Sequence, residues 1–211
     1  MIDLTATYLG LTLKNPLVVS PSPLCQDVGR IRAMEDAGAA AVVLHSLFEE
    51  QIALNAGDFD RTLAAQQDGY AEAVSYLPEL HTYKLGPEEY LEHIRKAKAA
   101  VDIPVIASLN GATTGGWVRY AKLMEEAGAD ALELNIYHIA TDPTRPASEV
   151  EQQYVDLVND VRTAVKLPLA VKVGPSFSAF ANLAHRLVGA GANGLVLFNR
   201  FYQPDLDVEH L

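Results

Sequence analysis

The sequence contains one cysteine, Cys25, and one tryptophan among its 211 residues. A single cysteine excludes an internal disulfide framework and fits a reducing compartment, so we expect a cytoplasmic protein in which Cys25 is a buried or semi-buried free thiol. No apolar stretch approaches the roughly 20 residues of a membrane span. The first residues also lack the basic start and apolar core of a signal peptide. We therefore expect no membrane partner.

Basic residues are also scarce, with 16 Lys and Arg against 27 Asp and Glu and a formal net charge of −11. Binding to nucleic acid needs a basic surface, so this balance argues against a nucleic-acid partner. The acidic excess is typical of a solubility feature. It leaves room for a phosphate-bearing cofactor, which needs only local donors. We assign no metal ligands.

One pattern occurs three times, in residues 36–44, 126–134 and 189–197: a small-residue turn with glycine, then an apolar run. Each copy follows a helix-like segment, and a polar residue follows closely, namely His45, Asn135 or Asn199. A helix that stops at glycine and is followed by a strand is half of a βα unit. In (β/α) barrels, polar residues at the carboxyl ends of strands carry the chemistry.

The whole chain alternates strand-like and helix-like segments, which predicts one α/β domain over residues 1–211. The expected strands cover residues 17–20, 40–46, 103–110, 131–137, 167–174 and 194–200. This predicts a TIM (β/α)8-type barrel that is incomplete, with about six βα units and without the last two strands, because a complete barrel has eight strands and typically ~250 residues. The sheet must stay open, borrow strands from another chain, or belong to a longer protein. Its unpaired edges favour a homo-oligomer or association with another chain.

Residues 47–86 interrupt the alternation without a clear period. An insertion after a strand's carboxyl end lies on the catalytic face of a barrel, where it forms a lid or a substrate wall. A surface excursion or an oligomer contact is the alternative.

Side chains alternate across a strand, so the polar residues opposite the apolar, helix-facing side point into the barrel. On this basis Lys172, Asn135 and Asn199 converge near the carboxyl ends, together with Ser108, Asn110 and His45. A lysine inside a barrel is costly unless it is paired or used. Lys172 therefore either faces an anionic or electron-rich ligand or forms an ion pair with Glu133. Asn135 and Asn199 have both donor and acceptor capacity, which suits the edge of a planar heterocycle; strand-end amides that satisfy loop backbone are the alternative.

Several phrases of the sequence occur together in one known family. They are Asn15–Pro21, Ser46–Ile52, Ala107–Gly111, Glu133–Ile136, Val171–Val173 and Leu197–Arg200. In these the chain resembles the class 1 dihydroorotate dehydrogenase family, and more closely its dihydroorotate dehydrogenase-like members. The resemblance implies a barrel with FMN at its mouth. It also implies oxidation of a dihydropyrimidine-like, small planar substrate by hydride transfer to the flavin, with a role in pyrimidine metabolism.

The resemblance also implies roles for single residues. Ser20 would lie near the flavin, Asn110 and Asn135 would hydrogen-bond its ring, and Lys172 would stabilise the reduced ring at its N1–C2=O edge. Asn199 would face the substrate. His45 and Ser46 stand where the family usually has a lysine and a serine, and the resemblance makes both of them candidates for cofactor binding. His138 stands where the family has a cysteine base, and histidine can be a general base near neutral pH; a loop histidine without that duty is the alternative. The family's substrate-binding asparagine is replaced by Ala140.

In that family, glycine-rich turns after the seventh and eighth strands hold the flavin phosphate. The 211 residues contain neither turn, so we expect weak or absent FMN binding in this form. The leading hypothesis is an FMN-dependent oxidoreductase of CH–CH donors acting on a small molecule. The alternative is an inactive partial barrel with a structural or interaction role. A third class is a phosphosugar isomerase or an aldolase on a similar barrel; in an aldolase Lys172 would form a Schiff base.

Overall fold

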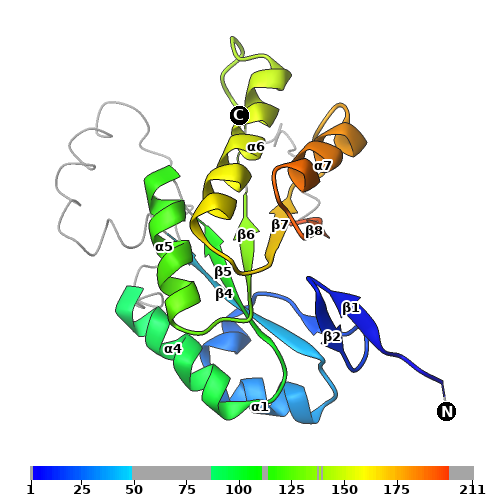
Figure 1. Ribbon diagram of the computed structural model, residues 1–211, viewed down its shortest axis with the longest axis vertical. Coiled ribbons are helices and arrows are strands. Elements are labelled where there is room, and N and C mark those ends of the chain that lie inside the picture. The colour runs from blue at the N-terminus through cyan, green and yellow to red at the C-terminus, as the bar shows by residue number, and fades with distance from the viewer. Residues whose placement is uncertain (1, 49–86, 111–113, 137, 139, 200–211) are drawn as a thin grey trace, which may run out of the picture.

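The computed structural model describes residues 2–48, 87–110, 114–136, 138 and 140–199. The expected insertion at 47–86 therefore lies outside the described residues except for its first two positions. The described residues form a six-stranded parallel sheet with the order β3-β4-β5-β6-β7-β8 (Figure 1). Its strands are β3 (Val18–Val19), β4 (Ala41–Phe48), β5 (Val105–Asn110), β6 (Ala131–Asn135), β7 (Leu169–Val173) and β8 (Gly194–Leu197). The six predicted strands and the incomplete barrel are confirmed.

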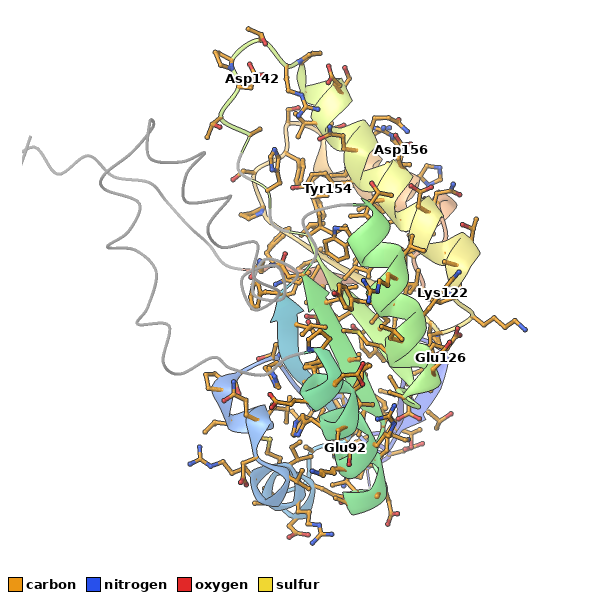
Figure 2. All side chains as sticks on the ribbon, turned by 90° about the vertical axis from the view of Figure 1, so that its left-hand side faces the viewer. Glu92, Lys122, Glu126, Asp142, Tyr154 and Asp156 are labelled. Carbon is orange, nitrogen blue, oxygen red and sulfur yellow. The ribbon has the colours of Figure 1, made fainter. Side chains whose placement is uncertain are left out.

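Helices alternate with these strands and cover the outer face of the sheet (Figure 1). They are a 3-10 turn η1 (Pro23–Gln26) and the helices α1 (Val28–Asp36), α4 (Pro87–Ala100), α5 (Thr114–Glu126), α6 (Ala147–Ala164) and α7 (Phe180–Gly189). The exposed charged side chains of α4, α5 and α6, such as Glu92, Lys122 and Asp156, point away from the sheet (Figure 2). Among the described helices, none is long and apolar enough to cross a membrane.

The three repeated turns share one geometry. Gly38, Gly128 and Gly191 have φ values of 105°, 92° and 110°, a region that costs a residue with a Cβ atom about 1–2 kcal/mol. Each glycine N–H donates back into the helix, and the next residue's N–H donates to a carbonyl five positions earlier, as in Ala39 N to Met34 O at 3.0 Å. This is the Schellman ending of a helix. The repeated pattern therefore stops α1, α5 and α7 and starts the next strand.

A glutamate at the end of the helix fixes the following unit in two of the copies. Glu35 Oε1 accepts hydrogen bonds from the backbone N–H groups of Asp102 and Ile103, at 2.9 and 3.1 Å. Glu125 Oε1 does the same for Lys166 and Leu167, at 2.7 and 3.2 Å. In each case a carboxylate ties the end of one helix to the loop that enters a strand further along the sheet. Part of the acidic excess is therefore structural.

A two-stranded hairpin, β1 (Ala6–Tyr8) and β2 (Leu11–Leu13), precedes the sheet and was not predicted from the sequence. Its two-residue turn has Leu9 and Gly10 at φ values of 55° and 77°. Leu9 packs inside the curved sheet against alanines that begin the strands, including Ala41 and Ala131. The hairpin therefore covers the amino-terminal end of the partial barrel (Figure 1). It leaves the carboxyl ends of the strands for the polar residues.

Candidate functional site

Most of the predicted polar residues lie at one edge of the sheet, because all six strands are parallel and their carboxyl ends meet there. Ser46 is in β4, Asn110 ends β5, Asn135 ends β6 and Lys172 is the fourth residue of β7. Ser20 follows β3, and Asn199 follows β8 by two residues. This edge is where (β/α) barrels place ligands.

Lys172 and Glu133 form an ion pair on the inner face of the sheet. The Lys172 Nζ atom lies 3.5 Å from Glu133 Oε1, and the two side chains are 12% and 3% exposed. Burial raises the pKa of the Glu133 carboxyl, while the Lys172 ammonium group and a Ser108 hydrogen bond lower it in part. The ion pair that the sequence left open as an alternative is therefore present. It places a cation and a buried carboxylate beneath the carboxyl ends.

Asn135 and Asn199 contact each other beside this pair. The Asn199 Nδ2 atom donates to Asn135 Oδ1 at 2.9 Å, and the Asn199 backbone N–H donates to Val173 O at 2.9 Å. Asn135 lies opposite Lys172 in the β6–β7 register. An amide that gives one hydrogen bond still has a second donor and an acceptor, so the pair can bind both donors and acceptors of a ligand. The predicted convergence of these two amides is confirmed.

Ser46 and Ser108 form a third polar contact on the inner face. Their hydroxyl oxygens are 2.8 Å apart, and the two residues are partners in the β4–β5 register. The helix side of the same strand is fixed by Tyr90, whose hydroxyl donates to Ser108 O and accepts from Ser108 N at 3.1 and 3.0 Å. Ser108 is therefore held from both faces of the sheet. It connects β4 to the Glu133 carboxylate of β6.

The prediction that His45 points into the barrel is wrong. Val43 pairs with Ile106 and Ser46 with Ser108, so two residues of β4, Leu44 and His45, lie opposite one residue of β5. Such a β-bulge shifts the alternation of side chains by one position. The His45 ring faces the helix layer instead, 5.0 Å from the Tyr90 ring and 5.6 Å from the His93 ring of α4. Ser46 takes the inner position, and His45 is no longer a cofactor-binding candidate.

The remaining predicted residues lie in loops or at strand ends. Ser20 is exposed, and its carbonyl oxygen is 3.9 Å from the Cys25 sulfur. Cys25 is a buried free thiol, as predicted, and burial raises its pKa. His138 is exposed in the loop after β6, where its carbonyl oxygen accepts a 3.4 Å hydrogen bond from Tyr154. Its part in catalysis stays a prediction, as does that of the half-buried Asn110.

A groove of about 700 Å³ between α5 and α6 is separate from this site. Its lining includes Arg119, Lys122 and Asp160, and it shares no residue with the polar contacts at the strand ends. In the part of the chain that the structure describes, no group of three or more His, Cys, Asp or Glu residues could hold a metal ion. The strand ends are therefore the candidate active site.

The fold and the site define a class: a βα barrel with one cation, one buried carboxylate and paired amides at the carboxyl ends of its strands. The family model described as dihydroorotate dehydrogenase matches residues 3–207. This chain therefore belongs to the dihydroorotate dehydrogenase family, as the resemblance in its motifs indicated.

Individual relatives agree with this assignment at low identity. The chain is 26% identical over 216 residues to the catalytic subunit of dihydroorotate dehydrogenase B (NAD(+)) of Thermoplasma volcanium, covering 99% of this chain and 65% of that protein. It is 27% identical over 202 residues to the NAD-dependent dihydropyrimidine dehydrogenase subunit PreA of Escherichia coli strain K12, covering 93% of this chain and 48% of that protein. The chain thus spans about two-thirds of the first relative and half of the second.

A solved structure shows the same fold. An IMP dehydrogenase/GMP reductase-like protein from Corynebacterium glutamicum aligns with a TM-score of 0.55 and 19% identity, covering 92% of this chain and 48% of that one. At this identity the likeness concerns the fold alone.

Two residues of the site were missing from the sequence-based candidates. Glu133 was considered only as a partner of Lys172, and Ser108 was recognised as inward-facing but given no role. The signal for both is the alternation on their strands: each polar residue lies between apolar neighbours that face the helices. A charged or hydroxyl residue at such a position has to be satisfied inside the barrel.

Proposed function

We propose that this chain carries the ring-binding part of an FMN-dependent oxidoreductase that oxidises a small planar, dihydropyrimidine-like substrate. The observation that carries the proposal is the convergence of Lys172 with the Asn135–Asn199 pair at the strand ends. The family match and relatives that are named as dehydrogenases of dihydroorotate and dihydropyrimidine support the same reaction type.

The chemistry of these side chains fits the polar edge of a flavin. Such an edge presents carbonyl oxygens and ring nitrogens in one plane, which an ammonium group and two amides can meet as donors and acceptors. In the proposal Lys172 and Asn135 hold the ring and Asn199 faces the substrate. When bound, FMN supplies the group that accepts a hydride from the substrate.

The proton that the substrate gives up requires a base. His138 lies three residues after Asn135 in an exposed position, so its ring can exchange protons with solvent. Histidine is suited to that task near neutral pH. In the proposal His138 takes the proton from the substrate and passes it to water, and a second acceptor reoxidises the flavin.

Flavin titration, followed by fluorescence, tests the proposal on the chain as it stands. Because the proposed contacts are made to the ring, riboflavin and FMN should bind with similar affinity, and weakly. Lys172→Gln should weaken both about tenfold, the equivalent of roughly 1.4 kcal/mol. Lys122→Gln, at an exposed lysine of α5, is the matched control and should change neither. The proposal is contradicted if neither flavin binds, or if Lys172→Gln binds the flavins as tightly as the parent chain does.

A further inference from the structure

Glu133 is a carboxylate buried inside the partial barrel, with 2% of its surface exposed. The other buried glutamate of the described residues, Glu151, pairs with Arg186 at 3.1 Å between the outer helices α6 and α7. Burying a carboxylate in a sheet is costly unless it is paired and hydrogen-bonded. The burial of Glu133 therefore has an explanation other than the solubility of the protein.

The register shows how the carboxylate reaches its partner. Glu133 lies level with Ala170 on β7, and Lys172 is two residues further along that strand, level with Asn135. Two residues of a strand span about 6.6 Å. The Nζ and Oε1 atoms are nevertheless 3.5 Å apart, so the two side chains lean toward each other across this offset. The ammonium group is thus held below the amides rather than extended into solvent.

Two further elements surround the same carboxylate. Ser108 of β5, level with Glu133 in the register, hydrogen-bonds it from the other side. The negative charge of Glu133 also acts on Tyr8 of the hairpin. Burial is the larger cause and this charge the smaller one, and together they raise the pKa of Tyr8 to about 12. Glu133 is thus fixed by neighbours on both adjacent strands, and its charge acts in surroundings of low polarity. The Glu133–Lys172 ion pair therefore has a fixed geometry, because its carboxylate is also hydrogen-bonded by a neighbouring strand.

We propose that Glu133 is the positioning residue of this site: its carboxylate holds the Lys172 ammonium group beneath the ligand and balances its charge. The identity of the ligand rests on the proposed function, whereas the contact between Glu133 and Lys172 does not depend on that function. An ionised Glu133 leaves a nearly neutral pair facing the ring. Without it, the full charge of Lys172 would stabilise an anionic ligand more strongly.

Amine labelling of the apo chain tests the contact directly. The label reacts with an amine that is free of its ion pair, and the Glu133 carboxylate lies 3.5 Å from the Lys172 Nζ atom. In Glu133→Gln, labelling of Lys172, identified by peptide mapping, should be about tenfold faster, the equivalent of about 1.4 kcal/mol of lost pairing. Glu133→Asp should restore part of the protection. Glu151→Gln, which removes the other buried glutamate, should leave the rate at Lys172 unchanged.

A thermal double-mutant cycle covers the case in which Glu133→Gln folds poorly. Glu133→Gln and Lys172→Gln each leave one buried charge without its partner, so each should lower Tm. The double variant should be more stable than the sum of the two losses predicts. Equal labelling of Lys172 in the parent and in Glu133→Gln, or strictly additive losses in Tm, would overturn the proposal.

The flavin-loaded chain gives a third readout. Glu133→Gln should raise the midpoint potential of bound FMN, because an unbalanced ammonium group stabilises the reduced, anionic ring; an unchanged or lower potential contradicts the charge-balancing role. If the chain binds no flavin, the proposed function fails while the labelling and the cycle still decide the role of Glu133. The two failures are therefore distinguishable.

Discussion

The side-chain amide of Asn199 donates a 2.9 Å hydrogen bond to Asn135 Oδ1, joining the segment after β8 to the end of β6. The contact passes over β7, whose Lys172 lies level with Asn135. Of the three polar groups in the proposed site, the one assigned to the substrate, Asn199, and one of the two assigned to the ring, Asn135, thus fix each other before a ligand arrives.

Removing this bond should cost stability as well as affinity. Asn199→Ala leaves the Asn135 oxygen, on a residue that is 9% exposed, without its donor, so the free energy of unfolding should fall by about 1 kcal/mol. Urea denaturation measures this loss. Asn182→Ala, at an exposed position of α7, is the control and should cause no loss. Equal stability of Asn199→Ala and the parent would contradict a formed hydrogen bond.

Acid should destabilise the fold through His45. Both nitrogen atoms of its buried ring are without a hydrogen-bond partner among the described residues, and burial, with the nearby His93 charge, lowers its pKa from 6.5 to about 4. Above pH 6.5 the ring is neutral in both states. As the pH falls from 6.5 to 4, the unfolded chain takes up the proton first, so stability is lost, on the order of 3 kcal/mol in total.

Urea denaturation between pH 7 and pH 4.5 measures this loss. His45→Leu should flatten the fall in stability over this range, whereas His185→Leu, at an exposed position of α7, should retain it. The same slope in His45→Leu and the parent would show that another group causes the acid sensitivity.

The hairpin should be sensitive to a single methyl group on β8. A Cβ atom at Gly194 would lie 2.8 Å from Leu9 Cδ2 and 3.3 Å from the Tyr8 ring. Gly194→Ala should therefore lower stability by about 1–3 kcal/mol, the usual cost of overpacking. At Gly115, in the first turn of α5, a Cβ meets nothing within 4 Å, so Gly115→Ala should raise stability by roughly 0.5–1 kcal/mol. A neutral Gly194→Ala would show that the hairpin packs loosely.

The open edges of the sheet should make this chain associate. In the described part of the chain, β3 and β8 each pair with a strand on one side only, and Leu17 and Leu197 near these edges are 64% and 52% exposed. We expect concentration-dependent sedimentation, which Leu197→Lys should reduce because edge charges oppose strand pairing. Val188→Lys, at an exposed position of α7, should have no such effect. A monomer at all concentrations would contradict this expectation.

The sequence predicted β4, β6 and β8 well because each of these three strands is preceded by a turn that only glycine makes without strain, as at Gly38 and Gly128. Parity then placed Glu133 and Lys172 correctly on the inner face, since β6 and β7 pair without a break. The same reasoning failed at His45, because a bulge depends on how β4 meets β5 and leaves no mark in β4 alone.

The hairpin was missed for a different reason. Its strands are three residues long, and its turn places Leu9 at a φ of 55°, where asparagine, aspartate or glycine is the usual signal. Leu9 occupies that position because its side chain fills the inside of the sheet. Tertiary packing therefore outweighs the local preference, and a single sequence does not reveal it.

The contact between Leu9 and Gly194 has a consequence for synthesis of the protein on the ribosome. Gly194 is synthesised 185 residues after Leu9, so the hairpin cannot complete its packing until nearly all of the described chain has emerged. Until then the apolar side of the hairpin is only partly covered by β4 and its neighbours. A nascent chain stalled before β8 should consequently be more prone to protease cleavage and chaperone binding at its first residues than one stalled after it.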